Sequence, residues 1–196
     1  MISLIVAGYE TTSAAQAWTL YASLRAPGVW ERAREEVDTV LVDSEIGAEL
    51  LDQLPSVDAI VQESLRLHPP VVVLPRVLAE DAEFGGDRLR AGSRLAISPY
   101  VTHRMPEVWP GPERFRPGRW DPQESLHRPA APSAFLPFGG GRHRCVGAPF
   151  ATAELKTILA ELLRSVDLRL LTDVAPASII VMRPRRGLPV AVRRRT

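Results

Sequence analysis

Cysteine and lysine are almost absent from this chain. Cys145 is the only cysteine among 196 residues, so an intramolecular disulfide is excluded, and with it the class of small disulfide-stabilised secreted domains. A single thiol also cannot build a zinc or iron–sulfur centre, because those centres need several protein ligands. Lys156 is the only lysine among 24 basic residues, a bias that suggests a GC-rich coding sequence and carries no mechanism.

The chain also lacks an excess of charge, a long apolar run and a leader pattern. Its formal net charge is +1, which predicts no overall attraction to nucleic acid or to a membrane surface. No apolar run has transmembrane length, and the first residues lack the basic start and the cleavage site of a signal peptide. We therefore expect a soluble cytoplasmic protein with no membrane anchor in this chain.

The single cysteine lies in an unusual setting. Three glycines at 139–141 precede it and allow a tight backbone turn, and the basic segment 142–144 adds positive charge beside the thiol. A helical pattern with Pro149 in its first turn follows. Cations and the free amides of a helix N-terminus favour the thiolate, the form that ligates metal. Cys145 is therefore either a buried small hydrophobic residue, as most lone cysteines are, or the single axial ligand of a haem iron.

The pattern Phe138-x-x-Gly141-x-His143-x-Cys145-x-Gly147 resembles the proximal haem-binding loop of the cytochrome P450 family, the haem-thiolate monooxygenases. This resemblance implies that the cofactor is haem b (iron protoporphyrin IX) and that Cys145 is its metal ligand. It also implies that His143, at a position that is usually basic, binds a haem propionate. The residues implied to contact the cofactor from this side are Phe138, Gly139, His143, Cys145 and Gly147.

Residues 1–25 predict a helix, because their apolar residues keep helical spacing. Ala7, Gly8 and Thr11 share one face and leave a groove of small residues where a flat ring could lie close. A lightly kinked core helix would show the same pattern. The segment also resembles the oxygen-activation motif of the family, which implies that Thr11 hydrogen-bonds dioxygen and that Glu10 helps to relay protons to it.

Residues 55–67 predict a second helix, which Pro69 and Pro70 end. It places Glu63 and Arg66 three residues apart on one face. Taken alone, such a pair is an ordinary surface pair of little energetic weight. Its surroundings, Glu-Ser-Leu-Arg-Leu-His-Pro-Pro, resemble the family helix that precedes the first sheet.

Prolines are too dense between residues 106 and 135 for a helix or a sheet, and a coil of this length needs a function or special anchoring. Within it, Pro-Glu-Arg-Phe at 112–115 resembles the meander motif of the family. The resemblance implies that Arg114 joins the pair in the preceding helix. The expected structural triad, which must be fully hydrogen-bonded if it is buried, is Glu63, Arg66 and Arg114.

The remaining patterns predict short elements. Arg76 interrupts the aliphatic strand 71–77, and in the family a basic residue at this place reaches a haem propionate, which a guanidinium can bind in bidentate fashion. We expect residues 148–164 to form a helix, because Phe150, Ala153, Ile158 and Leu162 fall close to helical spacing. Further helices are predicted at 28–42 and 46–52, a short one from residue 100, and strands near 88–90, 94–98, 166–171, 178–183 and 189–193.

These elements predict a mainly α fold with small β-sheets (α+β), which we interpret as a partial cytochrome P450 fold running from the oxygen-activating helix to the C-terminus. The resemblance covers nearly the whole chain but only the C-terminal half of the family. We expect the start of the distal helix and the substrate-covering helices to be missing. The segments of this single domain, 1–196, are the distal helix 1–25, the Glu-x-x-Arg helix 55–67, the meander 106–135, the cysteine loop 136–147 and the proximal helix 148–164.

The family resemblance implies insertion of one atom of O2 into a small organic substrate. The electrons would come from a ferredoxin with its reductase or from a flavoprotein reductase. A separate chain could supply the missing N-terminal half. The alternative is a catalytically inert remnant that binds haem weakly or not at all. The arginines near the C-terminus predict a solvated edge rather than a nucleic-acid site, because no aromatic residues are interleaved with them.

Overall fold

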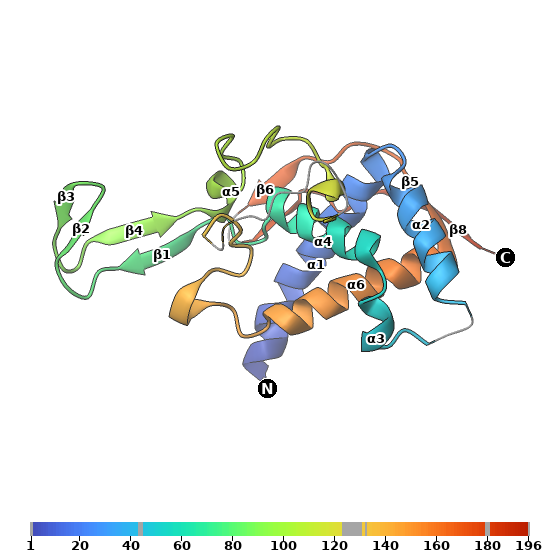
Figure 1. Cartoon of the computed structure of the whole chain (residues 1–196), viewed down its shortest axis with the longest axis horizontal. Coiled ribbons are helices and arrows are strands. Elements are labelled where there is room, and N and C mark those ends of the chain that lie inside the picture. The colour runs from blue at the N-terminus through green and yellow to red at the C-terminus, as the bar shows by residue number, and fades with distance from the viewer. Residues whose placement is uncertain (1, 43–44, 123–130, 132, 179–180, 196) are drawn as a thin grey trace.

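A computed structural model describes residues 2–42, 45–122, 131, 133–178 and 181–195. Helices form the body of the molecule, and an arm of two strands with a hairpin at its tip extends from it (Figure 1). The described helices are α1 (Ile2–Arg25), α2 (Val29–Val40), α3 (Ala48–Leu51), α4 (Pro55–Leu67), α5 (Pro99–Thr102) and α6 (Ala148–Ser165), with the 3₁₀ turns η1 (Pro117–Arg119) and η2 (Gly141–His143).

Local sequence explains several helix boundaries. Pro55 stands in the first turn of α4 and Pro149 in the first turn of α6, where a missing N–H removes no helical hydrogen bond. The residue before α4, Leu54, provides no side-chain cap. Glu36 of α2 replaces that cap, because its carboxylate accepts hydrogen bonds from the backbone N–H groups of Ser56 and Val57.

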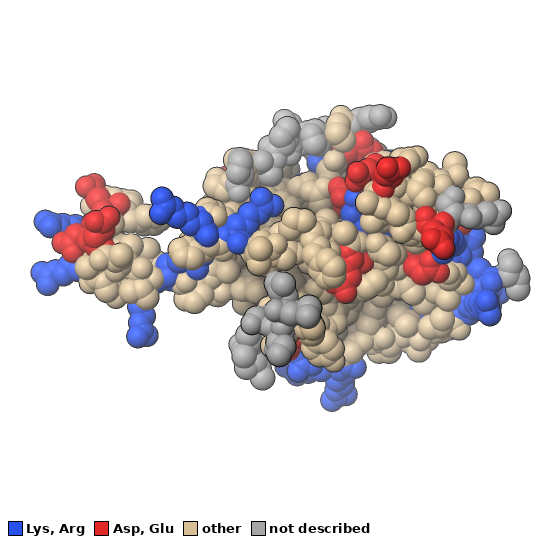
Figure 2. Space-filling model, turned by 90° about the horizontal axis from the view of Figure 1, so that it is seen from below, with Lys and Arg blue, Asp and Glu red and all other residues tan. Residues whose placement is uncertain are grey.

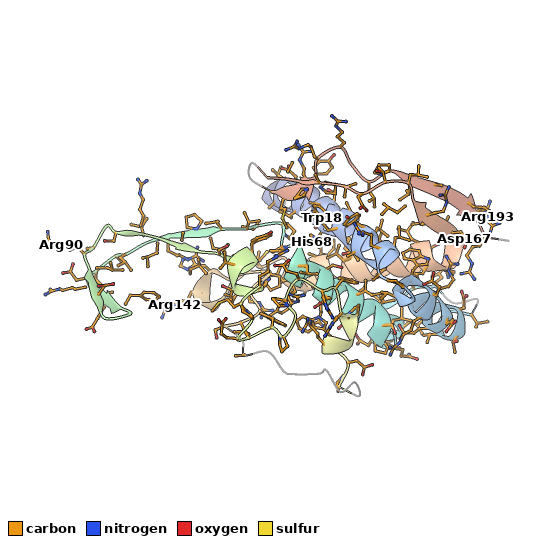
Figure 3. All side chains as sticks on the ribbon, turned by 90° about the horizontal axis from the view of Figure 1, so that it is seen from above. Trp18, His68, Arg90, Arg142, Asp167 and Arg193 are labelled. Carbon is orange, nitrogen blue, oxygen red and sulfur yellow. The ribbon has the colours of Figure 1, made fainter. Side chains whose placement is uncertain are left out.

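The strands in the described part of the chain pair into two-stranded antiparallel sheets. In the arm, β1 (Leu74–Val77) pairs with β4 (Arg94–Ile97), and β2 (Ala82–Phe84) pairs with β3 (Asp87–Leu89) at the tip. At the other end of the molecule, β5 (Val166–Leu170) pairs with β8 (Val190–Arg194), and Asp167 binds Arg193 across the two strands at 2.7 Å (Figure 3). The last pair is β6 (Pro176–Ser178) with β7 (Met182–Pro184).

This architecture confirms the expected mainly α fold with small sheets, with two differences in the strands. The sequence predicted one strand over 178–183, but β6 and β7 are two strands of a hairpin, and residues 179–180 lie outside the described part. Ile179, Ile180, Val181 and Met182 form an apolar run in the sequence, and such a run favours one continuous strand. The strand β2 was also missed, because its sequence Ala-Glu-Phe is too short to show alternation.

The core lies where α1, α2, α4 and α6 pack together. The helix α6 buries Leu155, Leu159 and Leu163 against α2 and α4, while Phe150 is 75% exposed and Ile158 is 37% exposed. The residues at helical spacing thus lie on different sides of the helix, since Phe150 is exposed and Leu162 packs against the core. Apolar residues occur on more than one face of α6, so spacing alone did not identify the buried face.

Trp18 and His68 connect α1 to the end of α4. Their rings are stacked with centroids 4.4 Å apart and an angle of 7° between the planes, and the two residues lie together in Figure 3. The indole N–H of Trp18 donates to the carbonyl of Met182 at 3.0 Å, and the N–H of Met182 donates to the carbonyl of Pro70 at 2.8 Å. These contacts hold β7 against α1.

Candidate cofactor site

Cys145 lies in the connection between η2 and α6, with its side chain exposed. Its backbone N–H donates to the carbonyl of Phe138 at 2.9 Å and closes the loop. Gly139 has φ 71° and Gly141 has φ 62°, a left-handed conformation that side chains with a Cβ adopt at a cost. A Cβ at Gly147 would lie 3.7 Å from the sulfur, so a glycine there leaves the thiol accessible.

A single exposed thiol suits a metal cofactor in which the cofactor itself, rather than the protein, supplies most of the ligands to the metal. The described residues contain no group of three or more His, Cys, Asp or Glu side chains that could hold a metal ion. Cys145 precedes the first residue of α6 by three positions, so the free N–H groups of that helix begin beside it. A haem needs a single protein ligand below the iron, and an accessible thiol beside a helix N-terminus fits that need.

The second segment predicted to face the cofactor is the N-terminal part of α1, which runs without interruption past Gly8. The hydroxyl of Thr11 donates to the carbonyl of Ala7 at 2.8 Å, and a Cβ added at Gly8 would meet nothing within 4 Å. Ala7 and Tyr9 are exposed. Figure 2 views the molecule from the side of this helix end, and uncharged side chains dominate the middle of that view. A flat apolar ring could therefore approach α1 closely here.

The other predicted site residues are placed as follows. Glu10 lies on α1 with its carboxylate 3.8 Å from the guanidinium of Arg183 on β7, and both side chains are about half exposed. Arg76 is on β1, partly buried, and donates to the carbonyl of the preceding Pro75 at 2.8 Å. His143 ends η2 and is exposed. The structure pairs neither Arg76 nor His143 with a carboxylate among the described residues.

Glu63 and Arg66 meet inside the protein. Two hydrogen bonds of 2.8 Å join the guanidinium to the carboxylate, and both side chains are completely buried. The remaining N–H groups of Arg66 donate to main-chain carbonyls of His103, Pro112 and Arg114. All five donors of the guanidinium therefore have acceptors, which makes a buried charge tolerable.

The third guanidinium at this pair belongs to Arg119 and not to the expected Arg114. Arg119 is 6% exposed, and its Nε donates to Glu63 at 3.2 Å. Arg114 has an exposed side chain and takes part only through its backbone carbonyl. Burial lowers the pKa of Arg119 below its ordinary value, and the neighbouring Glu63 opposes that effect.

The sequence offered two equivalent candidates for this position. Residues 112–115 and residues 117–120 both read Pro-x-Arg-aromatic, and only the three-dimensional path of the coil decides between them. In the structure, the indole N–H of Trp120 also donates to Glu63 at 3.0 Å, so the second copy docks on α4 through its arginine and its aromatic residue. The carboxylate of Glu63 can accept these hydrogen bonds because α4 contacts η1 directly.

Comparisons with known proteins agree with this geometry. The family model described as Cytochrome P450 matches residues 1–187. The chain belongs to the cytochrome P450 family. Cytochrome P450 139 of Mycobacterium tuberculosis is 46% identical over 99% of this chain and 46% of its own length. The sterol 14alpha-demethylase of Mycolicibacterium vanbaalenii is 39% identical over 85% of this chain and 37% of its own length.

Solved cytochrome P450 structures confirm the fold. The chain superposes on the heme domain of cytochrome P450DA with a TM-score of 0.90 and 30% identity, over 100% of this chain and 44% of that chain. A retinoic acid-bound cyanobacterial CYP120A1 gives a TM-score of 0.89 and 32% identity, over 98% and 45%. This P450 chain thus spans less than half the length of these relatives. Within its described residues, no helix combines the length and apolarity that crossing a membrane requires.

Proposed function

We propose that this P450 chain forms the thiolate side and part of the distal side of a haem-thiolate monooxygenase site. The observation that carries the proposal is the exposed Cys145 thiol, held beside the start of α6 by a glycine-rich loop, in a chain of this family. Cys145 would hold the haem iron as a thiolate, and Phe138, Gly139 and Gly147 would shape the loop beneath the ring. When bound, the haem supplies activation of O2 and transfer of one oxygen atom to an organic substrate.

On the distal side, Ala7 and Gly8 would let the ring lie close to α1. Glu10 and Thr11 would hold and deliver protons, because a carboxylate next to a hydroxyl can pass a proton to a bound ligand. Glu10 is exposed enough to exchange protons with solvent, and Arg183 would hold its carboxylate near the mouth of the site. Arg76 and His143 would bind the propionates, since a guanidinium and an imidazole N–H can each donate hydrogen bonds to a carboxylate.

Electrons would come from a separate cytoplasmic donor, a ferredoxin with its reductase or a flavoprotein reductase. The substrate would be a small organic molecule. Since the relatives are more than twice as long, the walls that determine substrate choice would come from sequence outside this chain, such as an N-terminal half supplied by another polypeptide.

The decisive experiment is haem reconstitution of the full 196-residue chain, followed by reduction and a carbon monoxide difference spectrum. We expect a red-shifted Soret band typical of thiolate ligation, and its loss in Cys145→Ala. His143→Ala should retain thiolate ligation and weaken haem affinity only. If the chain takes up haem without that band, or if Cys145→Ala retains it, the proposed ligand is wrong. No haem uptake at all would favour the inert remnant.

A further inference from the structure

His103 is a buried residue that the proposed chemistry does not use. It follows α5 directly, has no exposed surface, and packs against the rings of Phe135 and Trp109 with centroids 5.3 and 6.4 Å away. Its Nδ1 lies 3.0 Å from the carbonyl oxygen of Arg66, and its Nε2 lies 2.8 Å from the backbone nitrogen of Leu136.

These two partners determine the protonation state of the ring. The backbone N–H of Leu136 is a donor, so Nε2 must accept and carries no proton. The carbonyl of Arg66 is an acceptor, so Nδ1 must carry the proton and donate. A single neutral tautomer satisfies both bonds. A second proton on Nε2 would point at the N–H of Leu136 and break that hydrogen bond.

The bond to Leu136 leads to the cysteine loop through the main chain. The carbonyl of Leu136 accepts from the N–H of Gly139 at 3.0 Å, in the turn that also contains Phe138. The carbonyl of Phe138 in turn accepts from the N–H of Cys145 at 2.9 Å. His103 is thus the side chain that ties the end of α4, where Arg66 is paired with Glu63, to the turn on which Cys145 closes.

We propose that His103 is a positioning residue for Cys145: it orients the 136–139 turn, and through that turn the carbonyl that holds the Cys145 amide. This proposal depends on the proposed function in one respect, namely that Cys145 is the haem ligand. The connection itself is a property of the chain without cofactor. Its acid sensitivity follows from the required tautomer, because protonation of His103 removes the acceptor for Leu136.

The surroundings of His103 favour the neutral ring. Burial lowers its pKa to about 4, the hydrogen bond to the carbonyl of Arg66 opposes this shift, and the cations of Arg66 and Arg104 add to it. Arg66 is neutralised in part by Glu63, and Arg104 donates to the carbonyl of Leu67. The connection is therefore intact at neutral pH.

Amide hydrogen exchange of the full chain without haem tests the proposal. The hydrogen bond that His103 accepts contributes to holding the turn, so His103→Leu should speed exchange of the Leu136 and Cys145 amides by about fivefold. The matched control is His68→Leu, a partly buried histidine whose pKa is also lowered; it has no bond to this turn, and the variant should leave both rates unchanged relative to the rest of the fold. His103→Gln, whose side-chain carbonyl can accept from Leu136, should retain most of the protection.

The pH profile gives an independent test if His103→Leu fails to fold. In the unmodified chain, protection of both amides, corrected for intrinsic exchange, should fall as the pH drops to about 4, where the ring in the folded chain gains its second proton. His103→Gln has no titrating group and should not show that fall. Faster exchange at Leu136 with no change at Cys145 would overturn the positioning role, as would an unchanged pH profile in His103→Gln.

Discussion

The guanidinium of Arg66 binds both carboxylate oxygens of Glu63 through two 2.8 Å hydrogen bonds, and neither side chain has any exposed surface. The carboxylate oxygens of Glu63 also accept hydrogen bonds from the side chains of Arg119 and Trp120 and from the backbone N–H of Arg116. The coil from residue 103 to residue 120 contains local turns, and these contacts tie it to α4. Glu63 and Arg66 therefore attach the segment 103–120, which precedes the cysteine loop, to α4.

Arg66→Lys tests whether the shape of the guanidinium matters beyond its charge. Lysine keeps the positive charge but offers three donors from one nitrogen, so it cannot bridge both carboxylate oxygens and three carbonyls. We expect the free energy of unfolding, measured by urea denaturation, to fall by about 3 kcal/mol. The control is Arg88→Lys, in an exposed pair with Asp81, where a change below about 0.5 kcal/mol is expected. Similar losses of stability in both variants would show that the planar shape of the Arg66 guanidinium does not matter beyond its charge.

The two Pro-x-Arg-aromatic segments provide a matched pair of variants. Arg119→Ala removes a buried cation that donates to Glu63 and to the carbonyl of Gly111, so we expect a loss of about 2 kcal/mol in the free energy of unfolding. Arg114→Ala removes an exposed side chain whose backbone carbonyl remains in place, and its effect should stay within about 0.5 kcal/mol. Thermal denaturation under identical buffer conditions measures both. A larger effect at Arg114 would restore the arrangement expected from sequence.

Element boundaries were most predictable where proline marks them. The helix predicted at 55–67 coincides with α4, because Pro55 stands in its first turn and Pro69 and Pro70 stop it. The family resemblance, carried by the cysteine loop, correctly identified the fold as well. These features depend on residues whose backbone requirements are local, so a sequence pattern is enough to reveal them.

What the sequence could not reveal depends on packing between distant segments. The choice of Arg119 over Arg114 is made by the path of a coil without regular structure. The C-terminal arginines were expected to be solvated, yet Arg195 donates to Asp38 of α2 and to the carbonyl of Leu163. His103 had no assigned role, because its two partners are backbone groups and leave no trace in the pattern.

Stability should depend on pH through His68 and His103, the two histidines whose pKa the fold lowers. Burial, and then the nearby Arg104 and Arg66, lower the pKa of His68 to about 3, and burial lowers that of His103 to about 4. Histidine in the unfolded chain has a pKa of about 6.5. Between that pH and the lower pKa values of the folded chain, the unfolded chain therefore binds more protons than the folded chain does. Stability from both groups is therefore fully present above pH 6.5 and is lost as the pH falls toward 4 and 3.

Urea midpoints between pH 7 and pH 5 measure this dependence. Each histidine should contribute roughly 2 kcal/mol to the loss over that range. His68→Phe preserves a ring that can stack on Trp18 but removes the titrating group, so it should reduce the slope by about half. A slope unchanged in this variant would show that other groups carry the acid sensitivity.

Two glycines at the candidate site should respond to alanine in opposite directions. Gly139 has φ 71°, and a Cβ there would be strained in addition to contacting Leu74 at 3.6 Å, so Gly139→Ala should lower the free energy of unfolding by about 1–2 kcal/mol. Gly8 is inside α1 with open space where its Cβ would be, so Gly8→Ala should raise the free energy of unfolding by about 0.5–1 kcal/mol.

Gly8 also separates the requirements of folding from those of cofactor binding. If a haem ring lies against α1, the larger Gly8→Val should weaken haem uptake, measured by Soret titration of the chain. A matched Ala17→Val change on the same helix, two turns beyond the candidate face, should leave haem uptake unaltered. Because a Cβ at Gly8 would meet nothing within 4 Å in the folded chain, a selective loss of haem affinity in Gly8→Val would indicate the approach of the ring. Equal haem affinities in Gly8→Val and the unmodified chain would place the ring elsewhere.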